Sequence, residues 1–278
     1  MCGVGIISDA GWRDDACGCD PMKVKYIEAF DLNSAWYQTV KACMEDGFER
    51  PVFRGSRQGA SRKELDYLNI LVTNPGHRPL IPDVPEGIPP PTSLKYVNEY
   101  LGYLMTPFKD DLEDYTYGER MTSKIDISKI SGAEEGHINL DMVIIDRIEG
   151  ARMSEDIDQL GTITEFLKKT PGTNRSIITI GRDRDLALTH PPCMRLLQFK
   201  GRYGKLHLSL YFRSWDIWGG FPSNLAALQL MKEHIAKEAG LDDGVIIAAS
   251  MGAHVYNGEW EIAEAISKGG TGRRVTIE

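Results

Sequence analysis

Residues 195–213 read Arg-Leu-Leu-Gln-Phe-Lys-Gly-Arg-Tyr-Gly-Lys-Leu-His-Leu-Ser-Leu-Tyr-Phe-Arg, and they are the part of the sequence most informative about the fold. Leucine or phenylalanine occupies every second position from Leu206 to Phe212, which predicts a strand with one apolar and one polar side. Residues 195–200 predict a partner strand. Gly201 and Gly204 between the two predict a hairpin turn.

Further strands and helices are predicted on either side of this hairpin. The strands are expected at residues 67–73, 176–180 and 245–249, and the helices at 34–46, 93–104, 157–168 and 224–239. Residues 142–145 fit either a short strand or part of a helix. This pattern predicts an α/β (α+β) fold with one large twisted sheet flanked by helices.

The expected domain organisation is simple. Residues 1–33 carry Gly, Asp and Cys without clear periodicity and predict an irregular N-terminal extension. Residues 34–278 predict a single domain. Within it, the proline-rich stretch 75–91 predicts an extended surface connection, because proline lacks the backbone donor that a strand or helix needs.

The composition is that of a globular enzyme or binding domain. The 278 residues are 42% hydrophobic and 26% charged, and 40 acidic against 32 basic residues give a formal charge of −8. This charge excludes a general attraction to nucleic acid. No apolar run approaches the ~18 residues of a membrane span, and the N-terminus lacks the features of a secretory signal, so we expect a cytoplasmic protein with no membrane partner.

The cysteines predict neither a disulfide framework nor a metal site. Five cysteines are an odd number in a chain of this length. Cys17 and Cys19, separated by one glycine, are compatible with a metal or redox pair. No second Cys or His pair stands at ligand spacing, however, and reduced thiols are the better interpretation.

Three short segments carry polar residues that packing does not explain: 191–199, 213–224 and 253–256. Cys193 follows a rigid diproline and enters a predicted strand. Arg213 ends the neighbouring predicted strand, close enough to stabilise a thiolate and lower its pKa. The pair therefore predicts an activated cysteine nucleophile, although a buried, inert thiol is the common alternative for a lone cysteine.

These segments resemble the thymidylate synthase family. Pro192, Cys193, Gln198 and Phe199 match its nucleophile segment, and the sequence from Arg213 to Asn224 matches the family pattern Arg-Ser-x-Asp-x-x-x-Gly-x-Pro-x-Asn at every fixed position. His254 and Tyr256 match a His-x-Tyr sugar-binding pair. Upstream, residues 98–104 and 115–120 resemble the segments that carry the catalytic glutamate and tyrosine. The resemblance spans roughly residues 34–265 and is nearest to a short, methanogen-type branch.

The resemblance implies the conversion of dUMP to dTMP by a thymidylate synthase-like domain. The one-carbon donor would be 5,10-methylene-tetrahydrofolate or a methanopterin-like analogue, without a metal. A cysteine thiolate adding at C6 of a pyrimidine makes C5 nucleophilic, which is the role expected of Cys193. Asn224 offers the donor and acceptor that the uracil edge requires. Glu99 is implied in proton transfer, Tyr117 at the C5 proton and Asp216 at the pterin.

The remaining implied contacts are to the nucleotide. Arg213 and Ser214 are the first candidates for the phosphate. The others are Arg54 and Arg57, then Arg175, each of which is a common type of surface charge when considered alone. In the family, arginines at the position of Arg175 reach the neighbouring subunit's site, which implies a homodimer. Gln198, His254 and Tyr256 complete the implied nucleotide-binding set.

Three departures from the family pattern leave the reaction open. Met194 replaces a histidine, Ser176 replaces the second of two arginines, and Glu99 and Tyr117 lie only 18 positions apart, so a tryptophan-bearing segment is missing between them. The alternative is a pyrimidine nucleotide hydroxymethylase acting on dUMP, dCMP or CMP, in which water traps the methylene intermediate. Asn224 favours uracil over cytosine.

Two readings from other classes explain less of the pattern. An acyl-transfer enzyme could use Cys193 with His190 or His254, but would leave Arg213, Asp216 and Asn224 unexplained. A nucleotide-binding module without catalysis would not need a cysteine beside an arginine.

Overall fold

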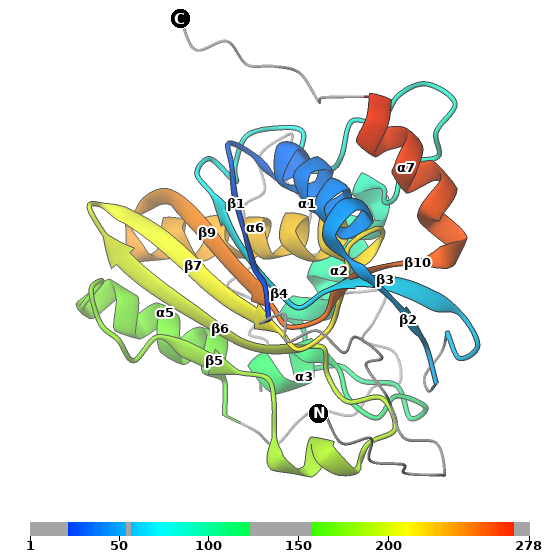
Figure 1. The fold of residues 1–278 in the computed structure, drawn as a ribbon. Coiled ribbons are helices and arrows are strands. Elements are labelled where there is room, and N and C mark those ends of the chain that lie inside the picture. Colours follow the sequence, from blue (N-terminus) through cyan, green and yellow to red (C-terminus); the bar gives the residue numbers. More distant parts are fainter. Residues whose placement is uncertain (1–21, 54–56, 123–156, 270–278) are drawn as a thin grey trace, which may run out of the picture.

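The hairpin lies in the middle of a six-stranded sheet (Figure 1). The computed structural model describes residues 22–53, 57–122 and 157–269. The strand order is β1-β4-β9-β7-β6-β5. The strand bounds are β1 Val24–Ala29, β4 Tyr67–Val72, β5 Ile177–Thr179, β6 Met194–Arg202, β7 Lys205–Phe212 and β9 Asp242–Ser250. The sheet is mixed, since β7 pairs antiparallel with β6 and parallel with β9.

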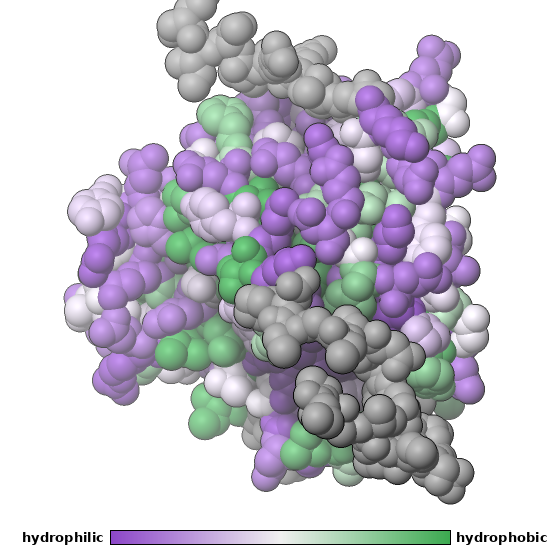
Figure 2. All heavy atoms as spheres, in the orientation of Figure 1, coloured by the Kyte–Doolittle hydropathy of each residue, from purple (hydrophilic) through white to green (hydrophobic). Residues whose placement is uncertain are grey.

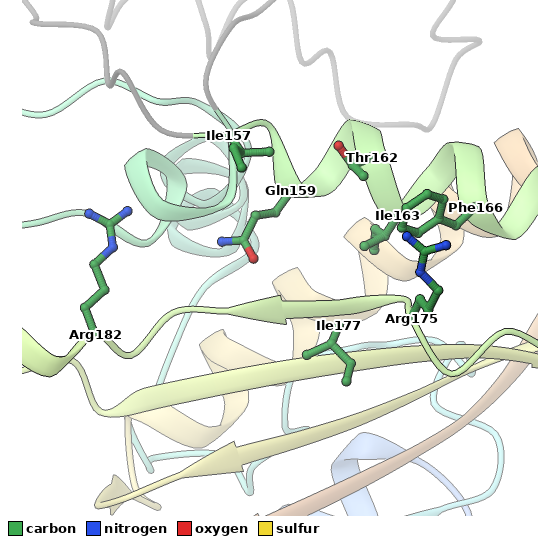
Figure 3. Close-up of a pocket in the computed structure, with 8 residues that line it drawn as sticks. All are labelled: Ile157, Gln159, Thr162, Ile163, Phe166, Arg175, Ile177 and Arg182. Atoms are coloured by element: carbon green, nitrogen blue, oxygen red, sulfur yellow. The ribbon is translucent and has the colours of Figure 1, made fainter.

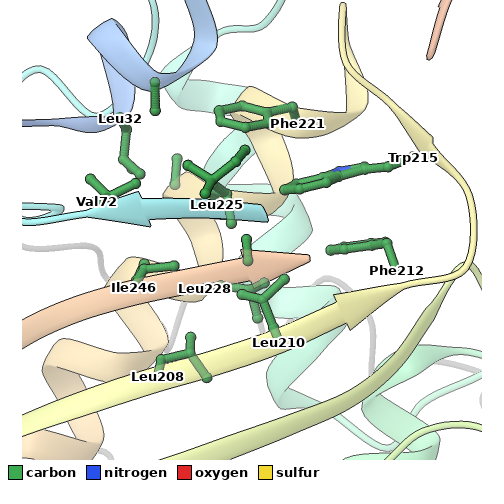
Figure 4. Close-up of a cluster of buried hydrophobic side chains, with 14 of the residues drawn as sticks. Leu32, Val72, Leu208, Leu210, Phe212, Trp215, Phe221, Leu225, Leu228 and Ile246 are labelled. Carbon is green, nitrogen blue, oxygen red and sulfur yellow. The ribbon is translucent and has the colours of Figure 1, made fainter. Parts of the chain in front are cut away.

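The alternation along β7 determines which face of the sheet is covered. Leu206, Leu208, Leu210 and Phe212 are all buried, while the intervening side chains are partly exposed. The buried side chains pack against α6 (Gly220–Ala239), through Phe221, Leu225 and Leu228 (Figure 4). Helices α1 (Leu32–Asp46), α2 (Leu94–Met105) and α5 (Gln159–Lys169) complete this layer. The predicted α/β class, a twisted sheet flanked by helices, is confirmed.

The turn of the hairpin is tighter than predicted. Gly201 belongs to β6, and the two loop residues are Tyr203 and Gly204, whose φ angles are 57° and 74°. A two-residue loop with both φ angles positive matches the twist of the flanking strands. Gly204 adopts this conformation without strain, whereas Tyr203 does so against the preference of L-residues.

A second, four-stranded sheet was not predicted. Its order is β2-β3-β10-β8, formed by Phe48–Pro51, Ser61–Leu65, Ala253–Tyr256 and Trp215–Asp216. These strands are two to five residues long, and β3 reads Ser-Arg-Lys-Glu-Leu, which has no apolar alternation. The sheet brings the segments around residues 62, 215 and 254 side by side.

Two predicted element boundaries are wrong. Residues 24–33 are not irregular: β1 pairs with β4, and Asp31 caps α1 by accepting a hydrogen bond from the Ser34 N–H at 2.8 Å. Helix α6 begins at Gly220 rather than at residue 224. Pro222 lies in its first turn, where no backbone donor is required, so the proline does not delay the helix.

The smaller elements are α3 (Tyr117–Met121), η2 (Asp183–Ala187), η3 (Asn257–Glu259) and α7 (Trp260–Gly269). Residues 142–145, Cys2, Cys17 and Cys19 lie outside the described residues. Among the residues that are described, no helix is long and apolar enough to cross a membrane, and no cluster of three or more His, Cys, Asp or Glu could hold a metal ion.

Candidate active site

Cys193 and Arg213 lie beside each other because they flank β6 and β7. Cys193 stands just before β6, Arg213 just after β7, and the Arg213 N–H donates to the Cys193 carbonyl at 2.8 Å. The guanidinium Nη2 lies 3.8 Å from Sγ of Cys193. Nη2 also donates to the Pro191 carbonyl at 2.7 Å, and Nε donates to the Pro192 carbonyl at 3.0 Å. Arg213 therefore holds the diproline turn and faces the thiol at the same time.

The balance of forces on the Cys193 thiol differs from the prediction. Burial raises its pKa, and the nearby charges of Arg213, Arg62 and Arg195 lower it, but the net pKa is above the ordinary value. The expected arginine effect is present and is outweighed by desolvation. The substrate-free protein therefore carries mainly the thiol form at neutral pH.

Tyr117 contacts the cysteine segment from the other side. It begins α3, and its phenol oxygen accepts a hydrogen bond from the Met194 N–H at 3.2 Å. Burial raises its pKa far above the ordinary value, so it is a neutral phenol. Tyr103 and Tyr115 pack around its ring, both with centroids 5.9 Å away. A stacked row continues along α2 from Tyr103 through Tyr100 to Tyr96.

Asn224, in the second turn of α6, faces this row. Its Oδ1 accepts a hydrogen bond from the indole N–H of Trp215 at 3.0 Å. Tyr100 of the row lies near this side chain, and burial raises the pKa of its phenol well above the ordinary value. The site is thus assembled from α2 and α3 and from the β6–β7–α6 segment, which comes much later in the sequence.

His254 and Tyr256 enter the site from the four-stranded sheet. His254 is 2% exposed, and its Nδ1 lies 2.9 Å from the Gly252 carbonyl, so Nδ1 carries the proton. Its Nε2 is buried and has no hydrogen-bond partner among the described residues. Burial and the charge of Arg62 lower the His254 pKa to about 4, which leaves Nε2 as a neutral acceptor. Tyr256 packs edge-on against the imidazole at 4.7 Å.

Arg62 is a site residue that the sequence analysis missed. It stands opposite Tyr256 in the β3–β10 register, and its charge acts to lower the pKa of that phenol against the larger, raising effect of burial. Its charge acts on both Cys193 and His254. It ends the same basic stretch as Arg54 and Arg57, but only the pairing of β3 with β10, invisible in the sequence, aims it at the site.

Arg57, Asp216 and Ser214 lie around the same sheet. The Arg57 guanidinium sits 5.1 Å from the centre of the Tyr256 ring and 3.5 Å from Glu259. Asp216 accepts the Trp218 N–H at 3.0 Å, and burial raises its pKa. Ser214 is half-buried between Arg213 and Trp215.

Three predicted residues do not join this group. Glu99 is 57% exposed and lies 3.9 Å from the Lys95 ammonium, one turn earlier on α2. Gln198 lies on the uncovered face of the six-stranded sheet, between Ile177 and Ser209. Arg175 lies at the sheet edge, and Arg54 lies outside the described residues. Among the described residues, the printed ion pair of Glu99 and the strand partners of Gln198 all lie outside the Cys193 group.

Arg175 lines a separate cavity of about 380 Å³ (Figure 3). Its guanidinium lies 4.6 Å from the centre of the Phe166 ring, and Ile163, Ile177 and Arg182 line the same space. Cys193 is not part of this cavity. Within one subunit, Arg175 is therefore separate from the nucleophile.

Comparison with known proteins decides the family. The profile of the thymidylate synthase family matches residues 109–269, more than half of the chain. The chain belongs to the thymidylate synthase family. It is 27% identical over 248 residues to a "Putative thymidylate synthase" of Methanosarcina acetivorans, covering 88% of this chain and 95% of that protein. The corresponding protein of Methanosarcina mazei is 28% identical over the same lengths. A "Thymidylate synthase" of Listeria monocytogenes is 40% identical over 116 residues, 41% of this chain and 37% of that one.

Proposed function

We propose that this member of the thymidylate synthase family converts dUMP to dTMP, through a covalent adduct between Cys193 and C6 of the pyrimidine. The observation that carries the proposal is the convergence on one site of Cys193, Tyr117, Asn224 and His254. Cys193 supplies a nucleophile, and Tyr117 supplies a phenol near it. Asn224 supplies an amide for the edge of the base, and His254 supplies Nε2, an acceptor without a partner among the described residues.

The chain's own residues support the first covalent step. The Cys193 thiol first ionises by giving its proton to water. The thiolate then forms the Sγ–C6 bond, the C5–C6 electrons pass as negative charge to the O4 side of the ring, and C5 becomes the nucleophile. Arg213, 3.8 Å from Sγ, stabilises the thiolate from which this step starts. The raised thiol pKa means that this stabilisation matters most when substrate is bound and water is excluded.

The nucleotide contacts follow from the same geometry. The Asn224 amide presents a donor and an acceptor to O4 and N3–H of uracil. The free Nε2 of His254 accepts a sugar hydroxyl, with Tyr256 beside it. Arg213, Arg57 and Arg62 supply positive charge for the phosphate, and Ser214 a hydroxyl. Arg54, Gln198 and Glu99 remain proposals from the family resemblance alone, without support from these contacts.

The described residues also fit a folate. The stacked tyrosines of α2 end at Tyr96, which is half-exposed and offers an aromatic face to a flat ring. Asp216 lies on the same side as the other site residues, and we propose that it holds the pterin. The bound 5,10-methylene-tetrahydrofolate, or a methanopterin-like analogue, supplies the carbon and, for a methyl product, the hydride. No metal is part of the proposal.

Hydroxymethylation of dUMP, dCMP or CMP is the second candidate, and Met194 favours it. Met194 is fully buried at the position where the family carries a histidine. The segment between Glu99 and Tyr117, which bears a tryptophan in the family, is shortened in this chain. Both changes alter the wall that keeps water from the one-carbon unit. Asn224 still favours a uracil substrate.

We also propose a homodimer in the cytoplasm, where nucleotide precursors and reduced folates are available. One face of the six-stranded sheet is uncovered by described residues and carries partly exposed Tyr26, Ile177, Leu196 and Ile247. Figure 2 shows hydrophobic side chains among polar ones on this side of the molecule. Packing two such faces together would place Arg175 near the neighbouring subunit. The net charge of −8 provides no attraction to nucleic acid.

Product analysis distinguishes the two reactions. Incubation with dUMP and methylene-tetrahydrofolate should give a 5-methyl product together with one equivalent of dihydrofolate. Recovery of tetrahydrofolate and a 5-hydroxymethyl product would select the second candidate. With 5-fluoro-dUMP and the folate, the wild-type mass should rise by nucleotide plus folate, and the Cys193→Ala mass should not. An equal gain in the variant would contradict the nucleophile.

A further inference from the structure

Trp215 is one of the most rigidly held side chains near the site. Its ring stacks on Phe212 at 4.5 Å with an interplanar angle of 7°, and on Phe221 at 4.9 Å and 23°. It is 2% exposed (Figure 4). A ring sandwiched between two others in a close-packed core has no alternative rotamer, so its N–H points in one fixed direction.

That direction leads to the Asn224 amide. The indole N–H is a donor and cannot accept, so it selects the oxygen of the amide and excludes its NH₂ group. The oxygen end of the amide is therefore held by a protein group.

Holding the amide in one orientation has a consequence for the base. Uracil presents the O4 acceptor and the N3–H donor, whereas cytosine presents the N4 donor and the N3 acceptor, so the two edges are complementary to opposite orientations of an amide. An amide that is free to rotate by 180° would pair with either base. With Oδ1 fixed on Trp215, its second lone pair remains for N3–H, and the second amide hydrogen remains for O4.

We propose that Trp215 is a positioning residue that makes Asn224 selective for uracil over cytosine. This inference rests on the proposed use of Asn224 to bind the base. Position 215 is the variable position in the Arg-Ser-x-Asp pattern, so the family motif itself does not specify this residue.

Trp215→Phe removes the N–H and keeps an aromatic ring between Phe212 and Phe221. Binding of dUMP and of dCMP is measured for each protein by equilibrium dialysis. Wild type should prefer dUMP, and Trp215→Phe should lose about tenfold of that preference, the size expected for one net hydrogen bond. Trp260→Phe is the matched control, because it also removes an indole hydrogen bond, to the Val255 carbonyl at 2.9 Å. It should keep the wild-type preference.

A second measurement needs no nucleotide. The chain has five tryptophans, so its indole N–H signals are few in a ¹⁵N-labelled sample. Asn224→Ala should shift the Trp215 signal, identified by its loss in Trp215→Phe, and leave the Trp260 signal in place. If Trp215→Phe does not fold, Trp215→Leu removes the same N–H with another apolar side chain and should also reduce the dUMP preference.

The outcomes distinguish a failure of the positioning role of Trp215 from a failure of the proposed function. An unchanged preference in Trp215→Phe, with dUMP bound by all proteins, overturns the positioning role alone. An unmoved Trp215 signal in Asn224→Ala overturns the contact itself. If the indole signal moves as expected but wild type binds neither nucleotide, the proposed function fails, and the selectivity inference fails with it.

Discussion

Cys193 shows how two opposing effects meet at one side chain. Burial disfavours the thiolate, three arginines favour it, and burial prevails in the substrate-free protein. Sequence spacing could indicate that an arginine is near. It could not indicate how much water the fold removes from the sulfur, which is the larger effect here.

Alkylation of Cys193 by iodoacetamide should therefore keep accelerating with pH beyond 8, because the thiolate fraction is still rising. Arg62→Gln removes a stabilising charge and should slow the reaction at pH 8 roughly threefold to tenfold. The rate is followed at the Cys193 peptide by mass spectrometry. Arg202→Gln, at the far end of β6, is the control and should react like wild type. A rate that levels off below pH 8 would contradict the raised pKa.

His254 links stability to pH in a defined window. Its pKa is lowered from 6.5 to about 4, so between these values the unfolded chain binds a proton that the folded protein does not. The contribution of His254 is complete above pH 6.5 and is lost as the pH falls toward 4. The loss amounts to at most ~3 kcal/mol.

His254→Gln should flatten the decline in the free energy of unfolding between pH 6.5 and 4, as measured by urea titration. His190→Gln is the control, since this histidine is exposed. If wild type and His254→Gln decline with the same slope, the buried neutral imidazole is not responsible for the pH dependence.

Two short elements, α3 and η2, are joined by a buried ion pair. Arg120 of α3 donates to Asp185 of η2 at 2.7 Å, and both side chains are nearly inaccessible. Burial acts to raise the Asp185 pKa, but hydrogen bonds from Arg120 and the Arg182 N–H outweigh it, and the net pKa is lowered. This pair connects the helix that begins with Tyr117 to the segment leading to Cys193.

Asp185→Asn should lower the free energy of unfolding by about 3 kcal/mol, because it leaves Arg120 buried without its counter-charge. Asp183→Asn, exposed on the same η2 turn, should change it by less than about 0.5 kcal/mol. Urea denaturation measures both. Replacing both partners, Arg120→Met with Asp185→Leu, should recover part of the loss. Wild-type stability in Asp185→Asn would show that the pair does not hold these elements together.

The whole molecule leaves one face of its main sheet without cover from described residues, and Arg175 lies at the edge of that face. Arg175 is separate from Cys193 within one subunit. This placement is explained if Arg175 contributes to the nucleotide site of a second copy of the chain. Dimerisation and catalysis would then depend on each other.

Mixing inactive Cys193→Ser with inactive Arg175→Gln under subunit exchange should restore activity. In the mixed dimer, the Arg175→Gln subunit keeps its cysteine and receives the intact arginine of its neighbour, so one of two sites is complete. Product formation from dUMP measures the recovery, and each variant mixed with itself is the control. Activity that stays at the level of the separate variants would place Arg175 in its own subunit's site or outside any site.

Much of the architecture followed from local pattern. The alternation from Leu206 to Phe212 predicted β7 and its buried face, and helical spacing predicted α1, α2, α5 and α6. The predicted end of α6 at residue 239 agrees with the structure, in which Gly240 follows with a φ of 66°. These features are short-range: the period of side chains along a strand or helix is a property of the backbone. The strands of the second sheet were missed because their residues carry no such period.

The same distinction between local pattern and tertiary structure applies to the candidate site. The sequence by itself determined the residue types and motif spacing around Cys193, Arg213, Asn224 and His254, and thereby the family. Only the tertiary structure decided that the charge of Arg62 acts on the thiol, that Glu99 lies exposed beside Lys95 and Gln198 opposite Ser209, and that Trp215 holds the Asn224 amide. Motifs record chemistry that is local along the chain, whereas burial, cross-strand register and the direction of a side chain are set by segments that meet only when the sheet is formed.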